Sequence, residues 1–195
     1  MSKNFDYSVN FSDELEKCFR ESEFVGEGHN GVVFLLGENK VIKIFRKNSV
    51  CKDECGIMKR VSKSRFFPKL HEIGERYMIR EYVDGVRLDK YLRRKKLNRK
   101  LCEELYNMIL DFEKLRFKRI DIRCKDIFIQ KDFTLKIIDP KNNYKKKVVY
   151  PRHLFKGLYK RKELEPFFEY VFQIDKARGV FWERKFEKYL ENNDI

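Results

Sequence analysis

The sequence lacks the long hydrophobic runs that a membrane protein requires. No window of its 195 residues approaches the roughly 18 uninterrupted apolar residues of a membrane-spanning helix. Its first residues, MSKNFD, contain no apolar stretch of the kind that a secretory signal carries. Internal repeats and linkers rich in serine or glycine are also missing. We therefore expect a cytoplasmic protein of one domain or of two small lobes.

The sequence also lacks the cysteine spacing of a metal or disulfide framework. It has five cysteines, an odd number, and no pair of them shows C-x-x-C spacing. Cys51 and Cys55 could share one face of a helix, but two thiols without nearby histidines make a poor zinc site. Unbridged thiols in a reducing cytosol are therefore the expectation.

Acidic residues are missing from two stretches of a chain whose net charge is +14. Segment 90–100 holds seven Lys and Arg, and segment 140–162 holds nine. Such runs are typical of a solvated face, or of a surface that binds phosphate, acidic peptides or nucleic acid. Aromatic residues are interleaved with the basic residues of the second run. Their side chains could stack on the bases of single-stranded nucleic acid or pack against the rest of the protein. These residues are Tyr144, Tyr150, Phe155 and Tyr159.

The apolar pattern predicts strands in the first part of the chain and mostly helices after it. Ser12 is expected to begin a helix, and Ser49 to cap another that ends near Val61. The remaining elements are strands over about 24–46, 69–73 and 77–82, helices over 88–95, from Asn98 onward, 163–173 and 181–191, and a hairpin over 127–138. This order indicates an α+β fold in two small lobes.

Three glycines, Gly26, Gly28 and Gly31, lie in the sequence GEGHNGVV. In a dinucleotide-binding fold such a motif opens a helix, but here a β-branched and aromatic run follows. The glycines are therefore expected to join two strands as a hairpin, where backbone N–H groups can approach phosphate oxygens without obstruction by a Cβ. Val33 would lie over a bound base. An ordinary glycine-rich turn is the alternative.

A lysine follows on the next predicted strand, VIKIF. The side chain of Lys43 points off one face of that strand, where it can reach the phosphates of a nucleotide. Glu54, on the helix that follows, could pair with Lys43 and hold it, with Asp53 and Glu72 as nearby competitors. A solvent-facing lysine is the alternative.

Three aspartates supply the remaining chemistry that transfer of a phosphoryl group needs. Asp121 would accept or orient the proton of a substrate hydroxyl, and Arg123 could steady the transferred charge. Asp126 and Asp139 could bind Mg²⁺, because hard carboxylate oxygens suit that metal. Any one of these aspartates could instead be a loop or cap residue, but their order and spacing favour a shared function.

These motifs together resemble those of protein kinases, and the chain is similar to small bacterial kinase-like proteins and RIO-type minimal kinases. GEGHNGVV resembles the glycine-rich loop, VIKI the strand with the ATP lysine, RIDIRCKD the catalytic loop and IID the metal-binding strand end. The resemblance covers about residues 24–139. It implies that Glu54 is the glutamate that holds the lysine, and that the backbone at Glu81 and Val83 binds adenine.

The resemblance also implies an architecture and an activity. The expected fold is a two-lobed protein-kinase-like fold, with residues 1–83 forming an N-terminal helix, a small antiparallel sheet and the αC helix of that family, which carries Glu54. Residues 84–195 would form a reduced, mainly helical C-lobe that includes the basic segment 140–162. The implied activity is that of an ATP- and Mg²⁺-dependent phosphotransferase, a serine/threonine protein kinase.

Several residues depart from the family pattern. Arg119-Ile120 replaces His-Arg, Asp126 replaces Asn, and Pro140-Lys141 follows Asp139 in place of Phe-Gly. Arg80 falls at the gatekeeper position, where a buried charge needs a partner, and no A-P-E segment is present.

These departures keep other functions open. A catalytically weak, nucleotide-binding pseudokinase is one, and a small-molecule kinase or a nucleic-acid-associated protein is another. The expected partners are ATP and a protein substrate, and the basic segments 90–100 and 140–162 could recruit an acidic substrate, nucleic acid or an anionic lipid surface.

Overall fold

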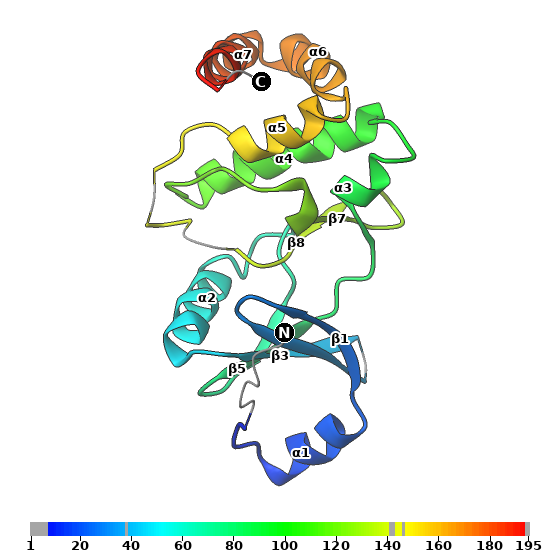
Figure 1. The fold of residues 1–195 in the computed structure, drawn as a ribbon, viewed down its shortest axis with the longest axis vertical. Helices are drawn as coiled ribbons and strands as arrows, with labels where there is room; N and C mark the ends of the chain where they lie inside the picture. The colour runs from blue at the N-terminus through cyan, green and yellow to red at the C-terminus, as the bar shows by residue number, and fades with distance from the viewer. Residues whose placement is uncertain (1–7, 38, 141–142, 146, 194–195) are drawn as a thin grey trace. The chain divides into compact units, whose positions relative to one another are not determined.

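The computed structural model describes residues 8–37, 39–140, 143–145 and 147–193. It has the predicted α+β content, with a small antiparallel sheet and several helices (Figure 1). The chain divides into two compact units. The first comprises the described residues up to Val83 together with Asp139 and Pro140, and the second comprises the remainder.

The first unit is built on a five-stranded antiparallel sheet with the strand order β1-β2-β3-β5-β4. Its strands lie where the apolar pattern places them, and the glycine motif joins the first two as a hairpin in which Gly28 pairs with Gly31. The strands are β1 (Glu23–Gly28), β2 (Gly31–Leu36), β3 (Lys40–Phe45), β4 (Leu70–Ile73) and β5 (Tyr77–Glu81).

One face of this sheet packs against helix α1 (Asp13–Arg20). Side chains alternate between the two faces of a strand, so every second residue of β3 points toward α1. Ser12 caps the helix as predicted, because its hydroxyl accepts a hydrogen bond from the N–H of Leu15 at 3.3 Å. The buried residues of this layer are Leu15, Val32, Leu36, Ile42, Ile44, Tyr77 and Ile79.

The opposite face carries Lys43, which pairs with Val33 on β2 and with Met78 on β5. Helix α2 (Asn48–Arg60) contacts β3, β4 and β5, and Glu54 is one of its buried residues. The predicted cap at Ser49 is wrong. The helix begins two residues earlier than a cap at Ser49 implies, and its N-cap residue, Lys47, makes no capping hydrogen bond through its side chain.

The second unit contains a three-stranded antiparallel sheet of β6 (Val86–Arg87), β7 (Ile127–Ile129) and β8 (Leu135–Ile137). Helix α4 (Arg99–Lys114) begins as predicted at Asn98, whose side-chain oxygen accepts a hydrogen bond from Leu101 N–H at 2.8 Å. Helix α3 (Leu88–Tyr91) is shorter than the predicted 88–95, and a 3-10 turn, η1 (Cys124–Asp126), precedes β7.

Three further helices pack around an aromatic core in the second unit. They are α5 (Arg152–Tyr159), α6 (Leu164–Ile174) and α7 (Lys176–Glu191). Helix α7 begins earlier than the predicted residue 181, because Asp175 caps it by accepting a hydrogen bond from Arg178 N–H at 3.0 Å. Helix α5 lies within the basic segment 140–162, where no helix was predicted.

Phe155 of α5 lies at the centre of this core. It is fully buried, and its ring centroid lies 5.2 Å from that of Phe168, 5.5 Å from Trp182 and 5.9 Å from Phe186. The stacking role that the sequence allowed for Phe155 is therefore wrong, since a buried ring cannot stack on a nucleic-acid base. Tyr144 also packs inward, with its ring centroid 5.1 Å from that of Phe117.

All five cysteines are free, as the sequence predicted. Among the described residues, no helix combines the length and the apolar character needed to cross a membrane.

Candidate functional site

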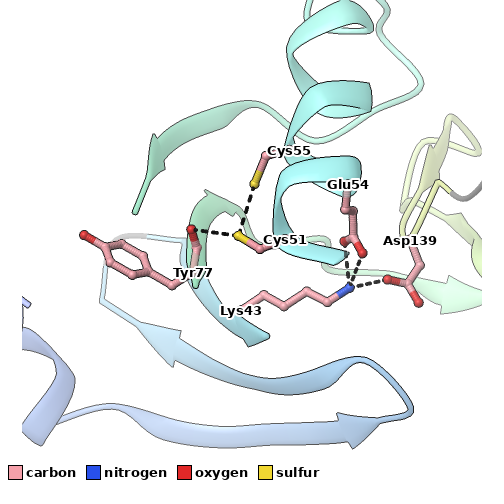
Figure 2. Close-up of polar contacts among 6 residues, drawn as sticks. All are labelled: Lys43, Cys51, Glu54, Cys55, Tyr77 and Asp139. Atoms are coloured by element: carbon pink, nitrogen blue, oxygen red, sulfur yellow. Dashed lines mark hydrogen bonds and ion pairs between the residues drawn. The ribbon is translucent and has the colours of Figure 1, made fainter. Parts of the chain in front are cut away.

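Lys43 is the centre of a charged cluster in the first unit. Its Nζ donates to both carboxylate oxygens of Glu54, at 2.6 and 2.9 Å, and contacts Oδ1 of Asp139 (Figure 2). Only 8% of the Lys43 side chain and 6% of the Glu54 side chain are exposed. The competing acids lie elsewhere: Asp53 is exposed, and Glu72 accepts a hydrogen bond from the Tyr77 hydroxyl. The pairing of Lys43 with Glu54 is thus present.

The two carboxylates keep Lys43 charged. Burial alone would lower the pKa of Lys43, but the negative charges of Glu54 and Asp139 outweigh that effect, and its pKa is raised. The cluster therefore holds a fixed ammonium group inside the protein, and an ammonium group in such a position is suited to bind phosphate.

Arg80 adds a second buried cation to this cluster. It lies on β5, and its Nη1 donates to the backbone oxygen of Glu81 at 2.9 Å. Burial lowers the pKa of Arg80, while the charges of Glu54 and Asp139 act in the opposite direction. The partner that a buried charge at this position requires is therefore provided by a carbonyl group and by two nearby carboxylates.

Asp139 has an unusual backbone conformation. Its φ of 63° lies in the left-handed region, which costs a non-glycine residue about 1 kcal/mol, although aspartate tolerates it better than most. The following residue is Pro140, and a residue before proline prefers extended backbone. Strain of this kind concentrates at functional sites, and here it accompanies the contact between Asp139 and Lys43.

The three predicted phosphate-binding glycines differ in their surroundings. A Cβ on Gly31 would lie 1.9 Å from the carbonyl oxygen of Ile44, so the close approach of β2 and β3 requires glycine there. A Cβ on Gly26 or Gly28 would meet no atom within 4 Å. Packing within the protein therefore does not explain glycine at these two positions, and the phosphate-binding interpretation remains for them.

The predicted adenine-binding backbone lies at the end of β5, at Glu81, and just beyond it, at Val83. The N–H of Glu81 donates to the oxygen of Lys69 at 2.8 Å, so it is used within the sheet. The N–H of Val83, by contrast, has no hydrogen-bond partner within the described segments, although Val83 is buried. A buried N–H group without a partner is uncommon and is available to a ligand.

In the second unit, the surroundings of the Asp121 side chain differ from what the sequence predicted. Its carboxylate is fully buried and is engaged by His153: Oδ1 accepts a hydrogen bond from the backbone N–H at 2.6 Å, and Oδ2 contacts Nδ1. Arg119 Nη2 lies 3.7 Å from Oδ2. Arg123, the other predicted catalytic residue, is exposed.

Sequence reasoning missed His153. The chain contains only three histidines, and His153 directly follows Pro151-Arg152 within the basic run. The small number of histidines was the one signal available in the sequence. The pairing with Asp121 left no local signal, because it joins residues that are 32 positions apart.

The predicted metal ligands lie in different units. Asp139 belongs to the first unit, whereas Asp126 ends η1 in the second, where its backbone oxygen accepts a hydrogen bond from Ile138 N–H at 3.1 Å. Within the described ranges, no three or more His, Cys, Asp or Glu side chains form a group that could hold a metal ion. Mg²⁺ commonly uses one or two carboxylates together with water and phosphate oxygens, so these aspartates have the right chemistry for it.

Comparison with known proteins gives a distant similarity. No protein-family model matches the chain. It is 20% identical over 133 residues to a Bacillus subtilis (strain 168) protein named "Putative serine/threonine-protein kinase YrzF". The alignment covers 65% of this chain and 62% of that protein, so the chain spans less than two thirds of the length of this relative. The similarity suggests a kinase-like relationship, with which the observed α+β fold is compatible.

Proposed function

We propose that the chain is an ATP- and Mg²⁺-dependent phosphotransferase that phosphorylates serine or threonine hydroxyls of proteins. The observation that carries this proposal is the buried cluster of Lys43, Glu54 and Asp139. Phosphoryl transfer depends mainly on fixed charges that neutralise phosphate oxygens, and a lysine held by two carboxylates is such a charge. The name of the similar Bacillus protein points to the same chemistry.

Most of the predicted nucleotide-binding and metal-binding residues have a role in this proposal. Lys43 would bind the phosphates, with Glu54 holding its ammonium group in place, and the backbone at Gly26 and Gly28 would contact phosphate oxygens. Val33, Glu81 and Val83 would line the adenine site. Asp126 and Asp139 would hold Mg²⁺, which when bound neutralises phosphate charge. The Asp139 side chain is 31% exposed, so an ion can reach it. Residues 1–83 and 84–195 would form the two lobes.

Incubation with γ-labelled ATP, Mg²⁺ and dephosphorylated casein tests the proposal. The protein is expected to label casein or itself, and removal of Mg²⁺ with EDTA is expected to abolish the labelling. A protein that binds ATP in an equilibrium titration but labels nothing would contradict the phosphotransferase proposal and would favour the nucleotide-binding pseudokinase.

We further propose that the protein substrate is acidic and binds to the two basic runs. A hydrogen bond links the first run to the residue that directly follows the second, because Leu97 N–H donates to the Glu163 carboxylate at 2.8 Å in the second unit. The cations beside this bond are exposed. We call them the basic surface, which comprises Arg93, Arg94, Lys95, Lys96, Lys160, Arg161 and Lys162.

Charge reversal at Lys160, Arg161 and Lys162 tests the basic surface. The triple change to Glu is expected to raise KM for casein about tenfold while leaving kcat unchanged. The reason is that exposed charges act mainly on the association of enzyme and substrate. The control is the same change at three exposed lysines elsewhere, Lys17, Lys63 and Lys69. Equal KM values for the two triple variants at low salt would contradict the proposal, and tighter binding to single-stranded RNA than to casein would favour nucleic acid.

A further inference from the structure

Asp121 and His153 form a pair in which the aspartate is hidden and the histidine is accessible. The Asp121 side chain has no exposed surface, whereas 33% of the His153 side chain is exposed. Both carboxylate oxygens lie against this one residue, since Oδ1 accepts the backbone N–H of His153 and Oδ2 contacts Nδ1 of its ring. A substrate hydroxyl therefore cannot reach the Asp121 carboxylate without displacing His153.

The pairing fixes which ring nitrogen is basic. A neutral imidazole has one N–H donor and one acceptor, and the carboxylate takes the N–H at Nδ1. The lone pair is then on Nε2, which has no hydrogen-bond partner in the part of the chain that the structure describes. Other ionisable groups nearby are Arg119, which faces Asp121, Arg152, which precedes His153, and Tyr150, three residues before His153.

We propose that Asp121 acts through His153, whose Nε2 removes the proton from the acceptor hydroxyl. This inference rests on the proposed phosphotransferase function. His153 is then the catalytic residue and Asp121 a positioning residue that selects the tautomer and stabilises the imidazolium. This assignment differs from the direct role that the sequence resemblance implies for Asp121.

The proposed step balances with ATP and an alcohol as reactants. The alcohol oxygen bonds to the terminal phosphorus of ATP while its proton passes to Nε2 of His153. The bond between that phosphorus and the bridging oxygen breaks, and the electron pair leaves with ADP. The imidazolium then returns its proton to water, which regenerates the base.

His153→Asn tests the role of the ring. Its amide can still donate to Asp121 from about the position of Nδ1, but it has no basic nitrogen. We expect kcat for casein labelling to fall about a hundredfold, KM for ATP to stay unchanged, and the acidic limb of the pH–rate profile to disappear. His71→Asn, on an exposed position of β4, is the matched control and should behave as wild type. A second replacement at the same position, His153→Gln, also lacks a basic nitrogen. Thermal unfolding of all three variants checks that the fold is retained.

A variant His153→Asn that is as active as wild type, or more active, would overturn the inference, because His153 would then be a bystander or would block Asp121. Nitrogen-15 NMR of the three histidines gives a readout that needs no nucleotide. We expect His153 to carry its proton on Nδ1 in the wild type and to lose that preference in Asp121→Asn. A wild-type His153 with its proton on Nε2 would also overturn the inference.

The two proposals fail in different ways. If the wild-type protein neither binds ATP nor labels any acceptor, the phosphotransferase function itself is wrong, and the catalytic role of His153 is wrong with it. If the wild type transfers phosphate and His153→Asn retains the full rate, only the role of His153 is wrong.

Discussion

Replacement of Lys43 by methionine is expected to lower the rate of phosphate transfer on the order of a thousandfold. Methionine is similar in length to lysine but has no charge, so the phosphates would lose their fixed cation. The Lys43 ammonium group is held by Glu54 at 2.6 Å and contacts Asp139, and so it needs little reorganisation when phosphate binds. Labelling of casein by wild type and variant under saturating ATP measures the effect.

The same replacement should also destabilise the protein. Without Lys43, the Glu54 carboxylate is buried beside Asp139 with Arg80 as the remaining cation nearby. Removing one partner of a buried ion pair costs about 3 kcal/mol or more. The double variant Lys43→Met, Glu54→Gln removes both charges and should regain most of the stability in urea unfolding, but none of the activity. If activity returned with stability, the lysine would have only a structural role.

The contribution of Lys43 to stability should depend on pH in the alkaline range. Because its folded pKa is raised, the contribution is fully present below the ordinary lysine pKa of about 10.4 and is lost as the pH rises through the folded value. The difference in unfolding free energy between wild type and Lys43→Met is therefore expected to shrink above that pH.

Gly31→Ala is expected to lower the free energy of unfolding by at least about 3 kcal/mol. The added Cβ would lie 1.9 Å from the Ile44 carbonyl oxygen and 2.9 Å from its carbonyl carbon. Backbone atoms cannot swing aside as a flexible side chain can, so β2 and β3 would have to separate. Urea unfolding of the two proteins measures the change.

Gly28→Ala is the matched control, and it tests function rather than packing. Its Cβ would meet no atom within 4 Å, so the free energy of unfolding should change little. If the backbone at Gly28 contacts phosphate, affinity for ATP should fall in an equilibrium titration while stability is kept. Unchanged affinity would show that this glycine does not contact the nucleotide.

Local signals in the sequence predicted much of the first unit and the start of α4 in the second unit. Alternating apolar residues identify the strands. The starts of α1 and α4 are identified by polar residues whose side chains cap a backbone N–H group three residues further along the chain. The pairing of Lys43 with Glu54 was also predictable, because a strand and the helix that follows it limit which acid can approach the lysine.

The second unit was less predictable because its key contacts join distant segments. Helix α5 lies in a run dominated by basic residues, and its apolar side is recognisable only once Phe155 packs against α6 and α7. The engagement of Asp121 by His153 depends on where that helix begins. No local periodicity reports such a contact, so the sequence predicted Asp121 but not its partner.

The thiols of α2 give the protein an internal chemical probe. Cys51 and Cys55 are buried on either side of Glu54 in the chain, with their sulfur atoms 3.7 Å apart and Cys51 next to the Tyr77 carbonyl (Figure 2). A reagent can reach them only when α2 moves away from the sheet, and the same movement separates Glu54 from Lys43. The rate at which these thiols are alkylated therefore measures how often the lysine loses its partner.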